Sequence, residues 1–63
     1  GKTIKVIYRL AKTNKIVATG EIVVDKKATS IKASEVPVPA GYKMVTTGSC
    51  SVKTKKIEIY VKK

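Results

Sequence analysis

Glu35 to Met44, reading EVPVPAGYKM, is the stretch that decides how this chain can fold, because it contains both of the prolines. Pro37 and Pro39 lack a backbone N–H group, and each keeps the residue before it out of the helical region. A regular helix therefore cannot pass through this stretch, and we expect an extended connector between two β-rich halves. Gly41 can adopt a positive φ at no steric cost, so a turn is expected at the end of the connector.

The half before the connector predicts a β-hairpin. Apolar and polar residues alternate over Thr3–Leu10, which is the pattern of a strand with one buried face. A turn follows, in which Asn14 is the residue best suited to a positive φ. Ile16–Val24 is then rich in β-branched residues and predicts the second strand. Gly20 lies inside this strand, where a glycine indicates a β-bulge or a close approach of another backbone.

The segment between the hairpin and the connector predicts little regular structure. Thr29 or Ser30 can cap one or two helical turns that end by Glu35, because Pro37 stops any longer helix. A loop that carries a single turn of helix fits the sequence equally well.

Two further strands are predicted after the connector. Tyr42–Thr46 predicts the third strand, and a turn around Gly48 closes it. Cys50 and Val52 then lie in a short polar stretch to which we assign no element. Lys56–Lys62 predicts the fourth strand, and its alternation is the most regular in the chain.

The order of these elements predicts a mostly β fold, with α+β character only through the short helix. Because the first and last strands alternate most strongly, we expect a small four-stranded β-grasp-like sheet whose terminal strands lie side by side and parallel in the middle. A short helix or loop crossover would cover its apolar face. Residues 1–63 are taken as one such module, and Gly1, typical of a remnant of tag removal, is given no structural meaning.

The alternation also divides the side chains between two faces. The expected core consists of Ile4, Val6, Tyr8, Leu10, Ile22, Val24, Ile31, Val36, Met44, Ile57, Ile59 and Val61. The opposite face of the sheet is expected to present Lys5, Ile7, Arg9, Glu58, Tyr60 and Lys62, and these six residues form the candidate ligand surface.

Length and composition limit the class of protein. A chain of 63 residues buries only about 60% of its unfolded surface, so the core is expected to be thin. A hydrophobic content of 43%, rich in Val and Ile, still indicates a folded domain. With a single cysteine, no histidine and four carboxylates, we expect no internal disulfide, no metal site and no cofactor. No apolar run approaches the roughly 20 residues that a membrane span requires.

The charge of +10 and the pI near 10.0 point to an acidic partner, such as nucleic acid, an anionic glycan or a cell-wall polymer. The other reading is that the charge serves solubility alone. The lysines are spread along the chain and form no block of five or six, which is typical of solvated strand faces. We therefore weigh solubility as the more frequent explanation.

No set of residues for catalysis is present, and we predict that the protein is not an enzyme. A nucleophilic role for Cys50 requires a histidine or another positioned base, and the chain has no histidine. General acid–base chemistry would have to use carboxylates that lie in separate predicted elements, namely Glu21, Asp25, Glu35 and Glu58.

Three tyrosines among many lysines suggest base stacking, as in nucleic-acid-binding proteins. Tyr8, however, shares its face with core residues, and Tyr42 directly follows the turn glycine as an anchor. Only Tyr60 is expected to be exposed. With the basic residues of its face it could hold a sugar or an acidic chain, although packing across the strands against Ile7 is the more common role.

Several motifs resemble one family along nearly the whole chain. They are Val6-Ile7-Tyr8 before a turn, Ala18-Thr19-Gly20, Asp25, Ala28-Thr29-Ser30, Val36-Pro37, Pro39-Ala40-Gly41-Tyr42, the Gly48 turn and the closing Ile57-Glu58-Ile59-Tyr60-Val61. With these motifs the chain resembles the mucin-binding-protein-type repeats, and related β-grasp-like repeats, of Gram-positive surface proteins.

The resemblance implies a non-catalytic repeat domain of a secreted or cell-surface protein, extracellular or attached to the cell wall. Such a repeat acts as an adhesin module or as a spacer. Its expected partners are anionic glycans, cell-wall polymers or neighbouring repeats of the same chain. The family offers no catalytic residues to transfer to this sequence. The alternative, which rests on the charge, is a small basic nucleic-acid-binding domain.

Overall fold

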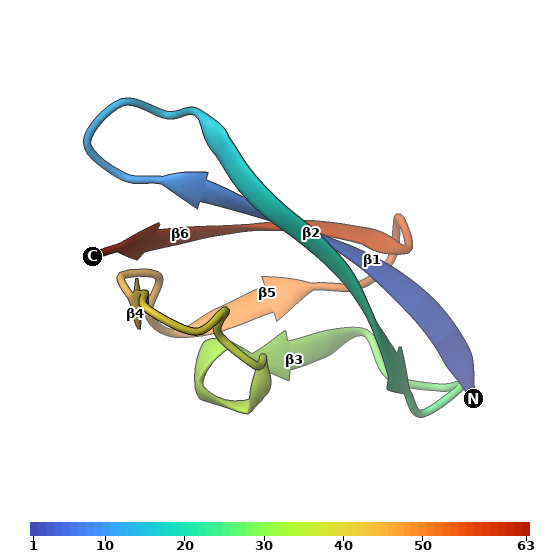
Figure 1. Ribbon diagram of the computed structural model, residues 1–63. Helices are drawn as coiled ribbons and strands as arrows, with labels where there is room; N and C mark the ends of the chain where they lie inside the picture. The colour runs from blue at the N-terminus through green and yellow to red at the C-terminus, as the bar shows by residue number, and fades with distance from the viewer.

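A computed structural model describes all residues, 1–63, and shows a chain of β-strands with a single turn of 3-10 helix (Figure 1). The strands are β1 (Lys2–Leu10), β2 (Ile16–Val24), β3 (Ser30–Lys32), β4 (Lys43–Met44), β5 (Ser49–Ser51) and β6 (Lys56–Lys62), and the helical turn is η1 (Ala33–Glu35). The predicted mostly β fold is therefore confirmed.

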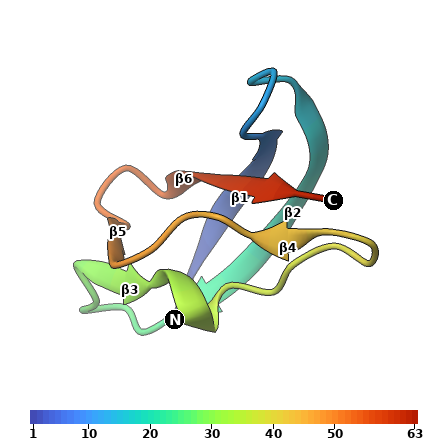
Figure 2. The same cartoon turned by 90° about the vertical axis from the view of Figure 1, so that its left-hand side faces the viewer.

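The two terminal strands lie side by side in the middle of the main sheet. The strand order is β2-β1-β6-β4, with β1 parallel to β6 and both outer pairs antiparallel. This is the predicted β-grasp-like order. The remaining strands, β3 and β5, form a separate antiparallel ladder, and Figures 1 and 2 show this ladder below β6. Loops and short strands thus take the place of a crossover helix.

The core lies on the inner face of the main sheet. Its buried cluster consists of Ile4, Val6, Tyr8, Val36, Val52, Ile57, Ile59 and Val61, and all of these except Val52 are predicted from the sequence. Four other predicted core residues, Ile22, Val24, Ile31 and Met44, pack against the cluster while partly exposed. Leu10 is also partly exposed but lies outside the cluster, at the hairpin end of β1.

Two buried residues escape the sequence pattern because they belong to no long alternating run. Val52 is fully buried, and its backbone N–H donates to the carbonyl of Thr29 at 3.0 Å. Ala33 is 2% exposed, and its N–H donates to the carbonyl of Gly48 at 2.9 Å. Both hydrogen bonds join a segment before the connector to a segment after it. They extend the β3–β5 ladder at its two ends.

The prediction that Ile7 is presented to solvent is wrong. Ile7 does point to the outer face, but it is only 8% exposed. It lies in the middle of the central strand, with Thr19 of β2 and Glu58 of β6 directly across from it. Neighbours on both sides cover a side chain at this position.

The turns follow the sequence closely. Asn14 has a φ of 62°, and Gly41 has a φ of 87°, as predicted for the hairpin turn and for the end of the connector. Residues between η1 and β4 form no helix, which confirms the extended connector. Lys55 also has a positive φ, of 60°, which the sequence does not predict because lysine has no special preference for it.

Three local predictions need correction. The bulge in β2 lies at Val17, opposite Tyr8 and Arg9, and not at Gly20, which pairs regularly with Val6. The segment after Thr29 begins as strand β3. Its helical part is the single η1 turn, as the loop alternative predicts, but neither Thr29 nor Ser30 caps it. A single 3-10 turn exposes few unpaired N–H groups, so it requires no serine or threonine cap.

The third predicted strand is shorter than expected. Only Lys43 and Met44 pair regularly with β6. Beyond them, the N–H groups of Val45 and Thr46 both donate to the carbonyl of Tyr60, and the N–H of Tyr60 donates to the Oγ1 of Thr46 at 2.8 Å. The threonine hydroxyl takes the place of a backbone acceptor, so the ladder ends here.

Tyr8 connects the sheet to the connector that decides the fold. Its ring is 5% exposed in the core, and its hydroxyl donates a hydrogen bond to the carbonyl of Pro37. Burial raises the pKa of Tyr8 above its ordinary value of 10.0, because the phenolate is poorly solvated there. This bond links residues that are far apart in the sequence.

We predict that Tyr8→Phe lowers the free energy of unfolding by about 1 kcal/mol at neutral pH, because one partly buried hydrogen bond is lost. In the wild type, stability should fall as the pH rises above 10.0, since the unfolded chain loses the Tyr8 proton first. The difference between wild type and variant should therefore shrink with rising pH. Urea unfolding at neutral and alkaline pH measures it, and a difference that grows with pH would contradict this role of Tyr8.

Candidate ligand surface

The strand register brings the six residues of the candidate ligand surface onto one face of the sheet. Lys5, Ile7 and Arg9 alternate along β1, and Glu58, Tyr60 and Lys62 alternate along the neighbouring β6. Because β1 and β6 are parallel, Ile7 lies opposite Glu58 and Arg9 lies opposite Tyr60. These residues are neighbours, but their side chains are not equally available to a ligand.

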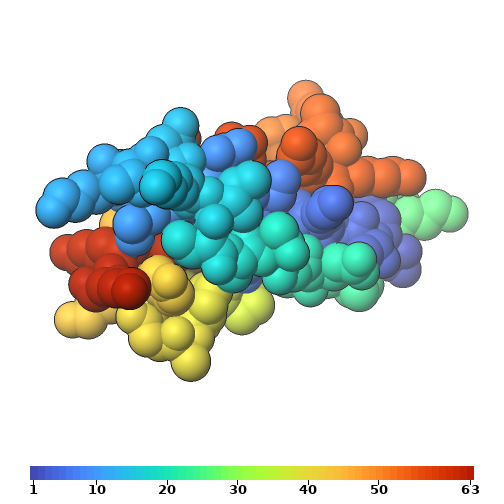
Figure 3. All heavy atoms as spheres, turned by 45° about the horizontal axis from the view of Figure 1, so that its top comes forward, coloured from blue at the N-terminus to red at the C-terminus, as the bar shows by residue number.

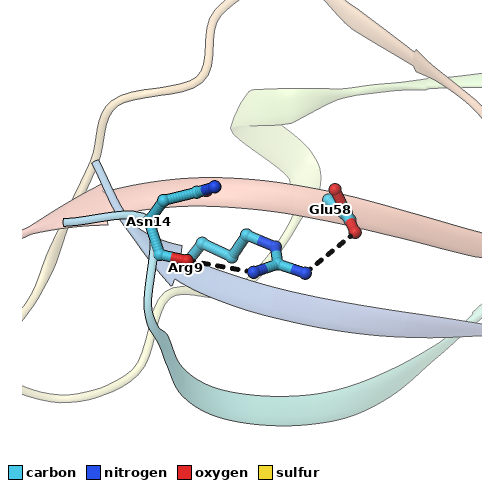
Figure 4. Close-up of polar contacts among 3 residues, drawn as sticks. All are labelled: Arg9, Asn14 and Glu58. Carbon is cyan, nitrogen blue, oxygen red and sulfur yellow. Dashed lines mark hydrogen bonds and ion pairs between the residues drawn. The ribbon is translucent and has the colours of Figure 1, made fainter. Parts of the chain in front are cut away.

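Arg9 and Glu58 are already bound to partners within the protein (Figure 4). One guanidinium nitrogen of Arg9 lies 3.4 Å from the Oε1 of Glu58, and the other donates to the backbone carbonyl of Asn14 at 3.0 Å. Both side chains are partly exposed, so the ion pair contributes at most about 1 kcal/mol to stability. It nevertheless neutralises both charges, and the bond to Asn14 ties the guanidinium to the hairpin turn.

Ile7 and Lys5 contribute little to a binding site. Ile7 is buried, as described above. Lys5 is exposed, and the register places Glu21 directly across from it on β2 and Lys56 on β6. Lys5 thus lies between one negative and one positive neighbour, which leaves no concentrated charge in this row.

Tyr60 is the one large hydrophobic residue of β6 that is exposed. It is 37% exposed, and both its backbone C=O and its backbone N–H are hydrogen-bonded to the Val45–Thr46 segment that follows β4. Val45, which follows β4, is 39% exposed. The ring and this valine form a small apolar area at the edge of the sheet.

Lys62 of β6 lies directly opposite Lys43 of β4. Both side chains are exposed, and the single ion pair of the protein, between Arg9 and Glu58, involves neither of them. Like charges directly opposite each other in an antiparallel pair are destabilising. The two ammonium groups share a face with Tyr60, and we name Lys43, Val45, Tyr60 and Lys62 the Tyr60 cluster.

The sequence predicts only half of the Tyr60 cluster. Tyr60 and Lys62 follow from the alternation of the last strand. Lys43 is missed as a site residue, because only the pairing of β4 with β6 places it opposite Lys62. The alternation of Tyr42–Thr46, with Met44 facing inward, is the signal that could have placed Lys43 on the outer face.

The Tyr60 cluster has the chemistry to hold an anion next to a flat ring. Two ammonium groups can neutralise a carboxylate, a sulfate or a phosphate, and such contacts weaken as salt is added. An aromatic face beside them offers apolar contact. The cluster forms no enclosed pocket, because the three hollows of the protein are lined by other parts of the chain.

The hollows lie around the crossover and not on the outer face. The first, of about 500 Å³, lies between the end of β2 and β3, where Val24 and Ile31 contribute to its wall. The second, of about 480 Å³, is lined mostly by small and hydroxyl side chains near η1 and the turn at Gly48. Only Met44 is a large apolar residue in that wall.

Cys50 lies in β5 directly opposite Ile31 and is half-buried against the core. No hydrogen bond involves its sulfur, and no group of three or more potential metal ligands is present in the chain. Its position fits a side chain that fills space in the core.

No helix of the protein has the length and apolar character needed to cross a bilayer.

The chain matches no protein-family model, no curated protein and no solved structure. Its family and its function therefore have to be inferred from the residues and their geometry. The resemblance to surface-protein repeats stays a prediction.

We predict that Lys43→Glu raises the free energy of unfolding by about 0.2 to 1 kcal/mol at low salt, because a repulsive cross-strand pair becomes attractive. Lys12→Glu changes the net charge equally in an exposed turn and is the matched control. Chemical denaturation at two salt concentrations measures both. An equal gain in the two variants would mean that only the net charge matters and that the ammonium groups of Lys43 and Lys62 do not interact.

Proposed function

We propose that this chain is a non-catalytic binding module of a cell-surface or secreted bacterial protein, an adhesin repeat that holds anionic glycans or cell-wall polymers at the Tyr60 cluster. The observation that carries the proposal is the pairing of Lys43 with Lys62 beside an exposed tyrosine ring. The extracellular or wall-attached setting comes from the resemblance to Gram-positive surface repeats.

An anionic sugar satisfies both parts of the Tyr60 cluster. Its carboxylate or sulfate would relieve the repulsion between Lys43 and Lys62, and its ring would pack against Tyr60. Lysine carries a compact charge on a flexible stem, so the two ammonium groups can adjust to different anions but do not fix one geometry. We therefore expect weak, salt-sensitive binding that tolerates several anionic polymers.

The tyrosines make nucleic acid the less suitable partner. Proteins that bind single strands without sequence preference stack successive bases on several aromatic rings. Tyr8 is buried here with its hydroxyl bound to Pro37, and Tyr42 is half-buried against the core. Tyr60 is then the one ring available for stacking, which suits a single sugar better than a run of bases.

The chain ends lie in positions that suit a row of repeats. The chain enters along β1 and leaves along β6, and because these strands are parallel, the two ends lie at opposite sides of the molecule (Figure 1). The longest dimension of the protein is 33 Å. Copies joined end to end would form a stalk, so the module would still act as a spacer where the Tyr60 cluster binds nothing.

The test uses titration with a heparin oligosaccharide as the anionic probe. We predict that Lys43→Gln with Lys62→Gln weakens binding. The slope of log K against log salt should become less negative by about 2, because two charge contacts are lost. Tyr60→Ala should weaken binding at fixed salt. The matched control is Lys12→Gln with Lys26→Gln, which removes the same charge from exposed positions outside the cluster.

Equal weakening by the two double variants would mean that dispersed charge, and not a local site, binds the probe. A second titration tests the alternative function with a labelled oligonucleotide and unlabelled random competitor at two salt concentrations. A sequence-specific reader holds its site roughly a thousandfold or more tighter than random sequence. Selective binding that survives competitor and salt would replace the glycan proposal with nucleic-acid binding.

A further inference from the structure

The hollow of about 480 Å³ near η1 differs in charge from the other two hollows of the protein, and we name it the η1 hollow. The cleft of about 500 Å³ has Asp25 and Glu35 in its wall, and the hollow of about 280 Å³ has Glu21. The wall of the η1 hollow contains no carboxylate. It includes one ammonium group and four hydroxyl groups, from Lys32, Ser34, Thr46, Thr47 and Ser49. Ligand pockets commonly have volumes of about 300 to 1,000 Å³, so this hollow suits a small anionic molecule in both size and charge.

The η1 hollow is formed entirely by the return of the chain between β2 and β6. One part of its wall comes from η1 and the residue before it, and the other part comes from β4 and the turn that leads to β5. Figure 2 shows the chain from β4 to β5 passing above η1. Figure 3 shows the cyan and teal residues of β2 across the front of the molecule, with the yellow residues around β4 projecting below them. The hollow thus lies on the β4 side of the sheet.

Hydrogen bonds hold both parts of this wall in place. The N–H of Ala33 in η1 donates to the carbonyl of Gly48 in the turn at 2.9 Å. The N–H groups of Val45 and Thr46 donate to the carbonyl of Tyr60, and the Oγ1 of Thr46 accepts the N–H of Tyr60 at 2.8 Å. A ligand would therefore meet groups that are already ordered, which lowers the entropy cost of binding.

Three successive backbone N–H groups in the turn have no partner within the protein. Those of Thr47 and Gly48 donate no hydrogen bond. Ser49 lies opposite Lys32, next to the hydrogen-bonded pair of Ala33 and Gly48, so the N–H of Ser49 points away from β3. Gly48 has a φ of 80°, a left-handed conformation typical of tight turns. Successive free N–H groups in a turn form concavities that bind anions.

The side chains of the η1 hollow also keep unused donors. The ammonium group of Lys32 forms neither an ion pair nor a hydrogen bond. The same is true of the hydroxyl groups of Ser34, Thr47 and Ser49. The Thr46 hydroxyl accepts one hydrogen bond and can still donate its own proton. Polar donors thus line a concave surface, and none of them is needed to stabilise the fold.

We propose that the η1 hollow binds a sugar that carries a phosphate or sulfate ester. The ester oxygens accept hydrogen bonds from the free N–H groups of the turn and are neutralised by the ammonium group of Lys32. The hydroxyl groups of the sugar pair with the serine and threonine hydroxyls, which both donate and accept. Met44 is the one large apolar residue of the wall and offers contact to the face of the sugar ring. A bare ion would leave the hydroxyl groups and Met44 unused.

This site goes beyond the proposed function and does not rest on it. The η1 hollow takes one esterified sugar, whereas the Tyr60 cluster is proposed to hold an anionic polymer. The two sites share no residue, although Val45 of the cluster is followed directly by Thr46 of the hollow. Backbone amides report on each site separately, so either proposal can fail while the other holds.

Titration of the isotope-labelled protein with glucose 6-phosphate, and separately with glucose 6-sulfate, tests the proposal. We expect at least one of the two esters to bind saturably, with a dissociation constant on the order of 1 mM. The largest shift changes should lie at the amides of Thr47, Gly48 and Ser49. Glucose and inorganic phosphate should each bind at least about tenfold more weakly than the better ester, because each uses only part of the hollow.

Two variants test the assigned contacts. Lys32→Gln should weaken binding of the ester by about tenfold or more, because a hydrogen bond to a charged group is lost. Lys12→Gln removes the same charge from the exposed hairpin turn and should leave the affinity unchanged. Thr47→Val keeps the shape and the backbone N–H but removes one hydroxyl, and should weaken binding by about fivefold. All three residues are exposed, so none of these changes should unfold the protein.

Several results would overturn the proposal. One is the absence of saturable binding for both esters, and another is a set of largest shift changes that lies outside the turn at Gly48. Equal weakening by Lys32→Gln and Lys12→Gln would show that only the net charge attracts the ester. Inorganic phosphate that binds as tightly as glucose 6-phosphate would show that the hollow holds an ion and does not recognise a sugar.

Discussion

The parallel pairing of β1 with β6 is the constraint on which the rest of the structure depends. Two parallel neighbours cannot be joined by a tight turn, so everything between them must return the chain across the inner face of the sheet. In this protein the return contains β2, three short strands, the η1 turn and a proline-containing connector, and no α-helix. The core is therefore closed by individual contacts between segments that lie far apart in the sequence. The clearest are the hydrogen bond from the Tyr8 hydroxyl to the Pro37 carbonyl and the packing of the fully buried Val52.

Features that depend on neighbouring residues could be predicted from the sequence, and features that depend on register could not. Alternation located the long strands, and residue preferences located the turns at Asn14 and Gly41. The β3–β5 ladder pairs short, mostly polar segments, so no pattern in either one reveals it. The same reason hid Lys43 from the predicted ligand surface, because its importance comes from lying opposite Lys62.

The charge of the protein has different consequences at the two edges of the sheet. Near the β4 edge, Lys43 and Lys62 face each other without a carboxylate partner, whereas Arg9 in the centre of the sheet is bound to Glu58. The β2 edge lacks basic residues altogether and exposes apolar side chains. The two edges therefore differ in charge, and a net charge that is dispersed in the sequence is unevenly distributed in the folded protein.

Chemical-shift mapping with a heparin oligosaccharide tests most directly whether binding is localised at the Tyr60 cluster. Titration of the isotope-labelled wild type needs no substitution and reports on every backbone amide at once. If the unpartnered ammonium groups and the exposed ring form a site, the largest shift changes will lie at Lys43, Val45, Tyr60 and Lys62. Changes of similar size at exposed lysines throughout the chain, such as Lys12 and Lys26, would show that the anion binds to dispersed charge and would contradict the site.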